Sequence, residues 1–231
     1  MSMEENGMSY GAIKTYVLRT GRMTEAQRRN YAALKATWCL PYVLEQCDFR
    51  AIFGNDAPVT VEIGFGMGTV TAHIAADNPD KNYIGIEVHK PGVGRLLGLI
   101  QSRALTNVRI IEHDAVVVLR DMIPDGSLAA CHIFFPDPWP KKRHHKRRLI
   151  QRAHTALIAQ KLAVGGYLYV VTDWREYAED ARSVLEQTAG LVNAYTGFAP
   201  RQPWRSETNF ERKGIRAGRA SCELFFVRTD G

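Results

Sequence analysis

The chain has 231 residues, 45% hydrophobic and 23% charged, a composition typical of a globular protein and unlike collagen-like, low-complexity or mostly disordered chains. Its apolar runs are far shorter than the ~20 residues of a membrane helix, and no secretory signal opens the sequence, so we expect a cytoplasmic protein with no membrane partner. The net charge is +6, and seven bases lie between Lys141 and Arg152 without an acid among them, which points to a local contact with a polyanion.

The first 50 residues lack the alternation of a strand and carry a weak basic stretch. Thr24 and Gln27 have the spacing of a capping box, which predicts a helix that runs to about Cys39 and ends before Pro41. We therefore expect residues 1–50 to form a basic helical extension and residues 51–231 to form the main domain.

From residue 59 onward, short β-rich runs alternate with helical stretches. Strands are expected at Val59–Ile63, Tyr83–Glu87, Val108–Glu112, Leu128–Phe135 and Tyr167–Thr172, with helices between them and a last strand at Cys222–Val227. Strand and helix in alternation require right-handed crossovers. The order therefore predicts an α/β fold with a mostly parallel, doubly wound sheet and helices on both faces.

Three glycines at alternate positions follow the first predicted strand: Gly64, Gly66 and Gly68. In an open α/β sheet, ligands bind beyond the carboxyl ends of the strands, and glycine lets the backbone approach a ligand closely. The spacing differs from the Gly-x-Gly-x-x-Gly of dinucleotide enzymes. A cofactor without a pyrophosphate is favoured over a plain strand-to-helix turn.

Two carboxylates end the next two predicted strands. Glu87 lies about 20 residues beyond the glycine loop, where a carboxylate binds ribose hydroxyls in nucleotide-binding folds; the alternative is a solvated strand end. Asp114 follows the third strand and could accept a hydrogen bond from an adenine amine. It could equally cap the following helix, and one residue can do both.

The fourth predicted strand ends in Pro136-Asp137-Pro138-Trp139-Pro140, and the basic run follows directly. Prolines stiffen the loop and hold the Asp137 carboxylate and the Trp139 ring at the sheet edge. A carboxylate can accept hydrogen bonds from guanine, a tryptophan can stack on a base, and the bases can hold phosphates. A solvated helix face or a localisation signal would also explain the basic run, but not Asp137 beside it.

No metal site is predicted. The four cysteines lie far apart with no Cys-x-x-Cys pair, so we expect reduced, mostly buried thiols. His144 and His145 have no third ligand at a suitable spacing.

Together, the Glu-x-Gly-x-Gly-x-Gly loop from Glu62, the Gly85–His89 segment, Phe134–Arg148, Thr172–Trp174 and Thr208–Glu211 resemble the bacterial tRNA (guanine-N7-)-methyltransferase (TrmB) family. The resemblance implies a Rossmann-like class I fold, with residues 51–231 as the methyltransferase catalytic domain, and transfer of a methyl group from S-adenosylmethionine to N7 of a guanine in the variable loop of tRNA. It implies a cofactor site at Glu62, Gly64, Gly66, Gly68, Glu87, Asp114 and Asp137, with Asp137 also the catalytic residue. By the same resemblance, substrate contacts fall on Lys141, Asp173, Thr208, Asn209, Phe210 and Glu211, and RNA contacts on Arg143, His144, His145, Lys146, Arg147 and Arg148.

The residues themselves leave two of these roles open. Asp173 could cap the helix expected near Arg175, and Thr208-x-x-Glu211 also matches a capping box; only the resemblance favours substrate contacts. Guanine N7 has a free lone pair and no proton, so Asp137 is expected to orient guanine and stabilise its developing positive charge rather than to act as a base.

Three rival functions remain at this stage. A methyltransferase for exocyclic amines would carry a second proline before the aromatic residue, and a nucleotide-dependent oxidoreductase would have the other glycine spacing. An RNA-binding module or tRNA chaperone without activity would not need acids where RNA docks. The expected partner is tRNA, no obligate protein partner is implied, and both a monomer and a homodimer agree with the sequence.

Overall fold

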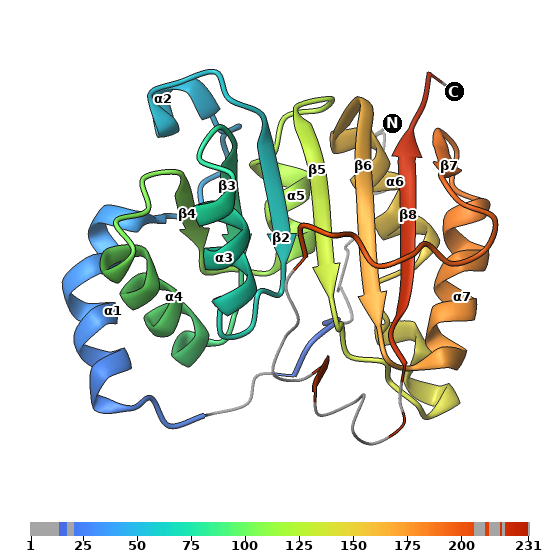
Figure 1. Cartoon of the computed structure of the whole chain (residues 1–231), viewed down its shortest axis with the longest axis horizontal. Coiled ribbons are helices and arrows are strands. Elements are labelled where there is room, and N and C mark those ends of the chain that lie inside the picture. Colours follow the sequence, from blue (N-terminus) through green and yellow to red (C-terminus); the bar gives the residue numbers. More distant parts are fainter. Residues whose placement is uncertain (1–13, 18–20, 206–210, 213–217, 219, 231) are drawn as a thin grey trace, which may run out of the picture.

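A computed structural model describes residues 14–17, 21–205, 211–212, 218 and 220–230 of the chain, and Figure 1 shows its arrangement. The strands are β1 (Cys39–Leu40), β2 (Val59–Ile63), β3 (Asn82–Ile86), β4 (Val108–Ile111), β5 (Leu128–Phe134), β6 (Leu162–Thr172), β7 (Leu191–Asn193) and β8 (Cys222–Arg228). The helices are α1 (Glu25–Trp38), α2 (Phe49–Phe53), α3 (Thr69–Asp77), α4 (Lys90–Ser102), α5 (Ala115–Asp121), the 3₁₀ turn η1 (Lys142–Arg147), α6 (Arg152–Lys161) and α7 (Arg175–Glu186).

The strands form one sheet in the order β1-β4-β3-β2-β5-β6-β8-β7. All neighbouring pairs from β1 to β6 are parallel, whereas β8 runs antiparallel to both β6 and β7. The prediction of a mostly parallel sheet is confirmed. Chain order reverses direction at the adjacent strands β2 and β5, where Ile63 lies beside Ile133. This is the topological switch point at which such sheets bind ligands.

Helices cover both faces of the sheet, as expected. Helices α1, α3 and α4 pack together on one face and α5, α6 and α7 on the other, as Figure 1 shows. Each face has its own apolar core, because parallel strands buried on both sides carry apolar residues in both directions. The site is therefore built on strand ends that are fixed from two sides.

Residues 25–40 form α1 and β1, and β1 belongs to the same sheet. The capping box is present: Thr24 Oγ1 accepts from the Gln27 amide at 3.2 Å, and the Gln27 side chain accepts from the Thr24 amide at 2.8 Å. Helix α1 packs closely on α4, where a Cβ at Gly94 would lie 2.6 Å from the Gln27 carbonyl oxygen. After it, β1 pairs with β4, a strand that the sequence analysis did not predict. The domain boundary at residue 50 stays a prediction.

Two further differences concern the second half of the chain. Strand β6 begins at Leu162, five residues before the predicted Tyr167, and its pairing with β5 shifts between Leu128 and Ala130. Strand β7 was not predicted. All four cysteines are free, but only Cys131 and Cys222 are buried. Among the described residues, no helix combines the length and the apolar character needed to cross a membrane.

Candidate active site

A cavity of about 390 Å³ lies at the carboxyl ends of the central strands. Its walls come from four segments: the glycine loop after β2, the strand end of β3, the start of α5 and the loop after β5 that contains Asp137. Residues 15–17 of the N-terminal segment and Leu149, which follows η1, complete the lining. The cavity therefore joins residues that the sequence spreads over more than 120 positions.

The three loop glycines differ in their surroundings. Gly64 and Gly66 line the cavity with φ angles of 71° and 58°, a region that side chains rarely adopt, and a Cβ on either would meet no atom within 4 Å. That open space is what a bound ligand would fill. Gly68 packs against α4, where a Cβ would lie 2.6 Å from the Leu96 Cβ, and its predicted place in the cofactor site stays a prediction.

Gly92 was missed by the sequence analysis. A Cβ at this position in α4 would lie 1.9 Å from the Gly66 carbonyl oxygen, so only glycine lets the helix approach the loop. The signal was present in the sequence as two glycines, Gly92 and Gly94, shortly after Glu87.

Glu87 lines the cavity and organises the loop. One carboxylate oxygen accepts from the amide of Gly66 at 2.9 Å, and the other accepts from the amides of Val88 and His89 at 2.7 and 3.0 Å. A carboxylate has about four acceptor positions. Three are used by the backbone, and one is left for a ligand hydroxyl.

Asp114 caps α5, as one of its two predicted roles required. Its Oδ1 accepts from the amides of Val116 and Val117 at 2.9 and 3.3 Å. Tyr16 lies beside it: burial, followed by the charge of Asp114 and a hydrogen bond to it, raises the pKa of the Tyr16 phenol. The neighbours His113 and Ala115 line the cavity. The second predicted role, contact with a cofactor, stays a prediction.

Glu62 is buried within β2 and is not among the residues that line the cavity. Burial raises the pKa of Glu62 from 4.5 to about 7; the charge of Glu87 adds to the rise and Thr71 opposes it. A carboxyl that keeps its proton near neutral pH is costly to ionise in the folded state.

This shift predicts a pH-dependent stability difference for Glu62→Gln. Between pH 4.5 and about 7 the folded protein binds a proton that the unfolded chain has released, so wild-type stability falls as pH rises through this window. The glutamine variant lacks this term. Its free energy of unfolding relative to wild type should therefore increase by about 2–3 kcal/mol from pH 5 to pH 8. Urea unfolding across this range measures it, with the exposed Glu45→Gln as control; a difference that is constant with pH would contradict the prediction.

The loop that carries Asp137 is held in a strained conformation. Phe135 and Trp139 on either side have φ angles of 52° and 46°, which are unusual for residues other than glycine. The Phe135 amide donates to the Val171 carbonyl at 2.7 Å, and the Trp139 Nε1 donates to the Thr15 carbonyl at 3.2 Å. Such conformations persist only where the surroundings fix them, and they concentrate at functional sites.

The N-terminal segment 14–17 connects this loop to the basic turn η1. The Arg147 Nε donates to the Lys14 carbonyl at 3.1 Å, and the Arg147 guanidinium lies 4.2 Å from the centre of the Trp139 ring. One face of Trp139 is therefore covered by Arg147. The predicted stacking of Trp139 on a base would require the other face or a movement of Arg147.

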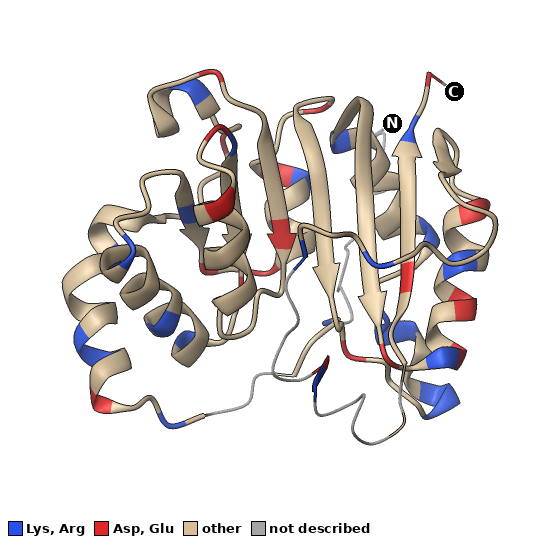
Figure 2. Ribbon diagram, viewed as in Figure 1, with Lys and Arg blue, Asp and Glu red and all other residues tan. Residues whose placement is uncertain are grey.

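The basic turn has an exposed side and a buried side. Lys141, Lys142, Arg143 and Lys146 are exposed, and Figure 2 shows the turn as a blue segment next to the start of α7. Arg148 is 2% exposed and bonded to two acids of α7, so its guanidinium is not on the surface. The predicted RNA contact of Arg148 is therefore not supported by its burial: the basic run is continuous in sequence, but Arg148 points inward.

The remaining residues predicted to bind the substrate differ in their exposure. Lys141 is exposed at the start of the basic turn, and Asp173 follows β6 at the same sheet edge as Asp137. Thr208, Asn209 and Phe210 lie outside the described residues. Glu211 is buried and is held by Arg205, which donates to both of its carboxylate oxygens at 2.7 and 2.8 Å.

Arg205 itself was missed by the sequence analysis. It is 1% exposed, and besides Glu211 it donates to Glu223 at 2.7 Å and to the Tyr169 hydroxyl at 3.2 Å. The Tyr169 hydroxyl in turn donates to Glu223. Burial opposes ionisation, but the two carboxylates outweigh it and raise the pKa of Arg205. One buried cation thus holds two carboxylates at the base of the C-terminal segment.

Comparison with known proteins agrees with this geometry. The family model described as "Putative methyltransferase" matches residues 56–224. The chain is 51% identical to a tRNA (guanine-N(7)-)-methyltransferase of Aromatoleum aromaticum over 97% of this chain and 86% of that protein. It is 48% identical to a protein of the same name from Chromobacterium violaceum over 97% and 99%.

Solved structures share the fold at low identity. The 16S rRNA methyltransferase KamB superposes with a TM-score of 0.59 at 14% identity, over 81% of this chain and 96% of that one. The antibiotic-resistance methyltransferase Kmr gives 0.54 at 15% identity, over 80% and 92%. At this identity the likeness concerns the class I methyltransferase fold alone.

Proposed function

The chain belongs to the family of bacterial tRNA (guanine-N(7)-)-methyltransferases, and we propose that it transfers a methyl group from S-adenosylmethionine to N7 of the variable-loop guanine in tRNA. The observation that carries the proposal is the cavity at the switch point, which is lined by both the glycine loop and Asp137, an exposed carboxylate that is followed by a basic turn. A cytoplasmic location fits a tRNA substrate.

The cavity residues fit S-adenosylmethionine. The open space at Gly64 and Gly66 allows a ligand to approach the backbone, and Glu87 has one acceptor position for a ribose hydroxyl. Asp114, between the cavity residues His113 and Ala115, would accept from an adenine amine beside its bonds to α5 and Tyr16. Glu62 is buried in the strand that leads into the loop and does not line the cavity. Its carboxyl group, when ionised, would favour the positive charge of a bound sulfonium. S-adenosylmethionine supplies, when bound, a sulfonium methyl group for transfer.

Asp137 would position guanine and stabilise its charge. Guanine N7 attacks with a free lone pair, so no base has to remove a proton, and orientation of the reactants should dominate catalysis. The ring becomes cationic as the new bond forms. A rigid carboxylate therefore stabilises the transition state more than the ground state.

The exposed side of the basic turn would hold the RNA. Lys141, Lys142, Arg143 and Lys146 can neutralise backbone phosphates, which position an RNA without reading its sequence. We assign Asp173 and the segment Thr208–Glu211 to substrate binding on the basis of the family. Glu211 is buried and bonded to Arg205, so its role would be to anchor the end of that segment.

The direct test is methyl transfer from labelled S-adenosylmethionine to unmodified tRNA transcripts. The product is mapped by chain cleavage specific for N7-methylguanine, with a transcript whose variable-loop guanine is replaced by adenine as control. Cleavage at that guanine, absent in the control transcript, is expected. Labelled RNA without such cleavage would move the acceptor to another atom. No label, together with an unchanged melting temperature in S-adenosylmethionine, would favour an RNA-binding module that has the fold but no activity.

A further inference from the structure

Arg148 links the Asp137 loop to helix α7. Its Nε donates to the Pro138 carbonyl at 2.9 Å, its Nη2 donates to both oxygens of Glu176 at 2.8 and 3.1 Å, and its Nη1 donates to Asp180. The guanidinium also lies 5.0 Å from the centre of the Tyr177 ring. Every nitrogen of the side chain is thus committed to the protein.

The charges around Arg148 explain why it can stay buried. Its side chain is 3% exposed, whereas those of Glu176 and Asp180 are 54% and 58% exposed, so one inward cation is matched by two acids that reach in from the surface. The hydrogen bond from Arg148 holds the pKa of Glu176 below its usual value. A buried charge without such partners would be strongly unfavourable.

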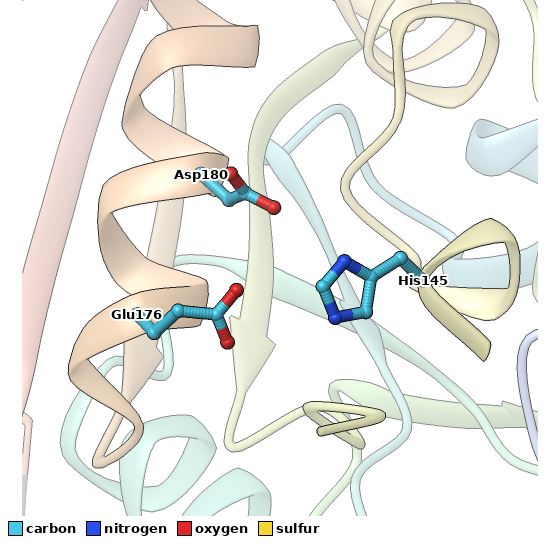
Figure 3. A group of neighbouring side chains, drawn as sticks. All are labelled: His145, Glu176 and Asp180. Carbon is cyan, nitrogen blue, oxygen red and sulfur yellow. The ribbon is translucent and has the colours of Figure 1, made fainter. Parts of the chain in front are cut away.

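The same acids form a cluster with His145, whose potential ligand atoms all lie within 4.8 Å of one another. Figure 3 shows Glu176 and Asp180 pointing from consecutive turns of α7 toward the imidazole. A divalent cation could use such a set, but the Arg148 guanidinium already binds both carboxylates and would repel a metal ion. The cluster is therefore better explained as an anchor for Arg148.

Resting on the function proposed above, we propose that Arg148 is a positioning residue for Asp137 and not an RNA contact. Pro138 follows Asp137 directly, and the loop between Phe135 and Trp139 is strained. The bond from Arg148 to the Pro138 carbonyl holds this strained loop against a helix, which fixes where the carboxylate points. Arginine suits the task because the donors of its planar fork sit on three separate nitrogens, which here reach one carbonyl and two carboxylates; the three donors of a lysine all sit on one nitrogen.

The test compares two arginines five residues apart, of which Arg148 points inward and Arg143 is exposed: Arg148→Met against Arg143→Met. Arg148→Met should lower kcat roughly 10- to 100-fold, because a small displacement of a catalytic group has effects of this size. It should leave the Kd of S-adenosylmethionine within about threefold and the salt dependence of tRNA binding unchanged. Arg143→Met should reduce the log–log salt slope by roughly 0.7 to 0.9, the value for one phosphate contact.

Two further variants keep the test decisive if Arg148→Met does not fold. Arg148→Lys retains the charge, and Asp180→Asn loosens the anchor from the side of α7; both should lower kcat without reducing the salt slope. A reduced slope in Arg148→Met, or in Arg148→Gln where the methionine variant does not fold, with kcat recovered at saturating tRNA, would make Arg148 an RNA contact. Wild-type kcat in folded Arg148→Lys and Asp180→Asn would leave it only a structural role. A wild-type protein that methylates no tRNA would overturn the proposed function first, and this inference with it.

Discussion

Asp137→Asn should lower kcat by a factor on the order of 10² to 10³ while leaving the Kd of S-adenosylmethionine within about threefold of wild type. Asparagine keeps the size and one acceptor of the side chain but removes the negative charge. The charge matters most when guanine becomes cationic, so the variant loses stabilisation in the transition state and little in the ground state. Steady-state kinetics with a tRNA transcript, together with calorimetric binding of S-adenosylmethionine, separate the two effects.

The matched control is Asp80→Asn. Asp80 is exposed and precedes β3, so this variant removes the same charge at the edge of the sheet that lies away from the cavity. It should behave like wild type in both measurements. If Asp137→Asn instead weakens cofactor binding by the same factor as it lowers kcat, Asp137 is only a cofactor ligand. The proposed role in stabilising charge on guanine would then be wrong.

The residues of the site that directly follow predicted strands could be identified from the sequence. The glycine loop, Glu87 and Asp137 all follow directly on strands whose apolar runs are evident in the sequence, and parallel strands bring their ends to one edge. The structure places all three around one cavity. The two-residue strand β1 was missed because a strand of that length has no alternation to detect.

What the sequence could not predict depends on partners far along the chain. Arg148 reads as one base in a solvated run, and only the acids 28 and 32 residues later, on α7, show that it points inward. Arg205 stands near Pro200 and Pro203, in a segment whose composition is typical of turns, and turns usually lie on the surface. Its burial depends on Glu223, which lies in β8, an antiparallel strand whose place beside β6 no local pattern indicates.

Arg205→Met should lower the free energy of unfolding by about 3–5 kcal/mol, the usual effect of removing one partner from a buried ion pair. Methionine fills much of the same space, so the loss comes from the charges that remain. Glu211 and Glu223 are 3% and 4% exposed, and each loses its cation. For a chain of this length the melting temperature should fall by roughly 10 °C.

The loss should also depend on pH, which distinguishes it from a packing defect. Without Arg205 the two buried carboxyl groups lose the cation that balances them, so the free-energy cost of burying them grows with the negative charge they carry, which is smaller in acid. The difference from wild type should therefore be smaller at pH 5 than at pH 8. Thermal unfolding at both pH values tests this, with the exposed Arg95→Met as control. An equal loss of unfolding free energy at both pH values would mean that Arg205 stabilises the protein by its packing contacts alone. Balancing the charge of Glu211 and Glu223 would then contribute nothing.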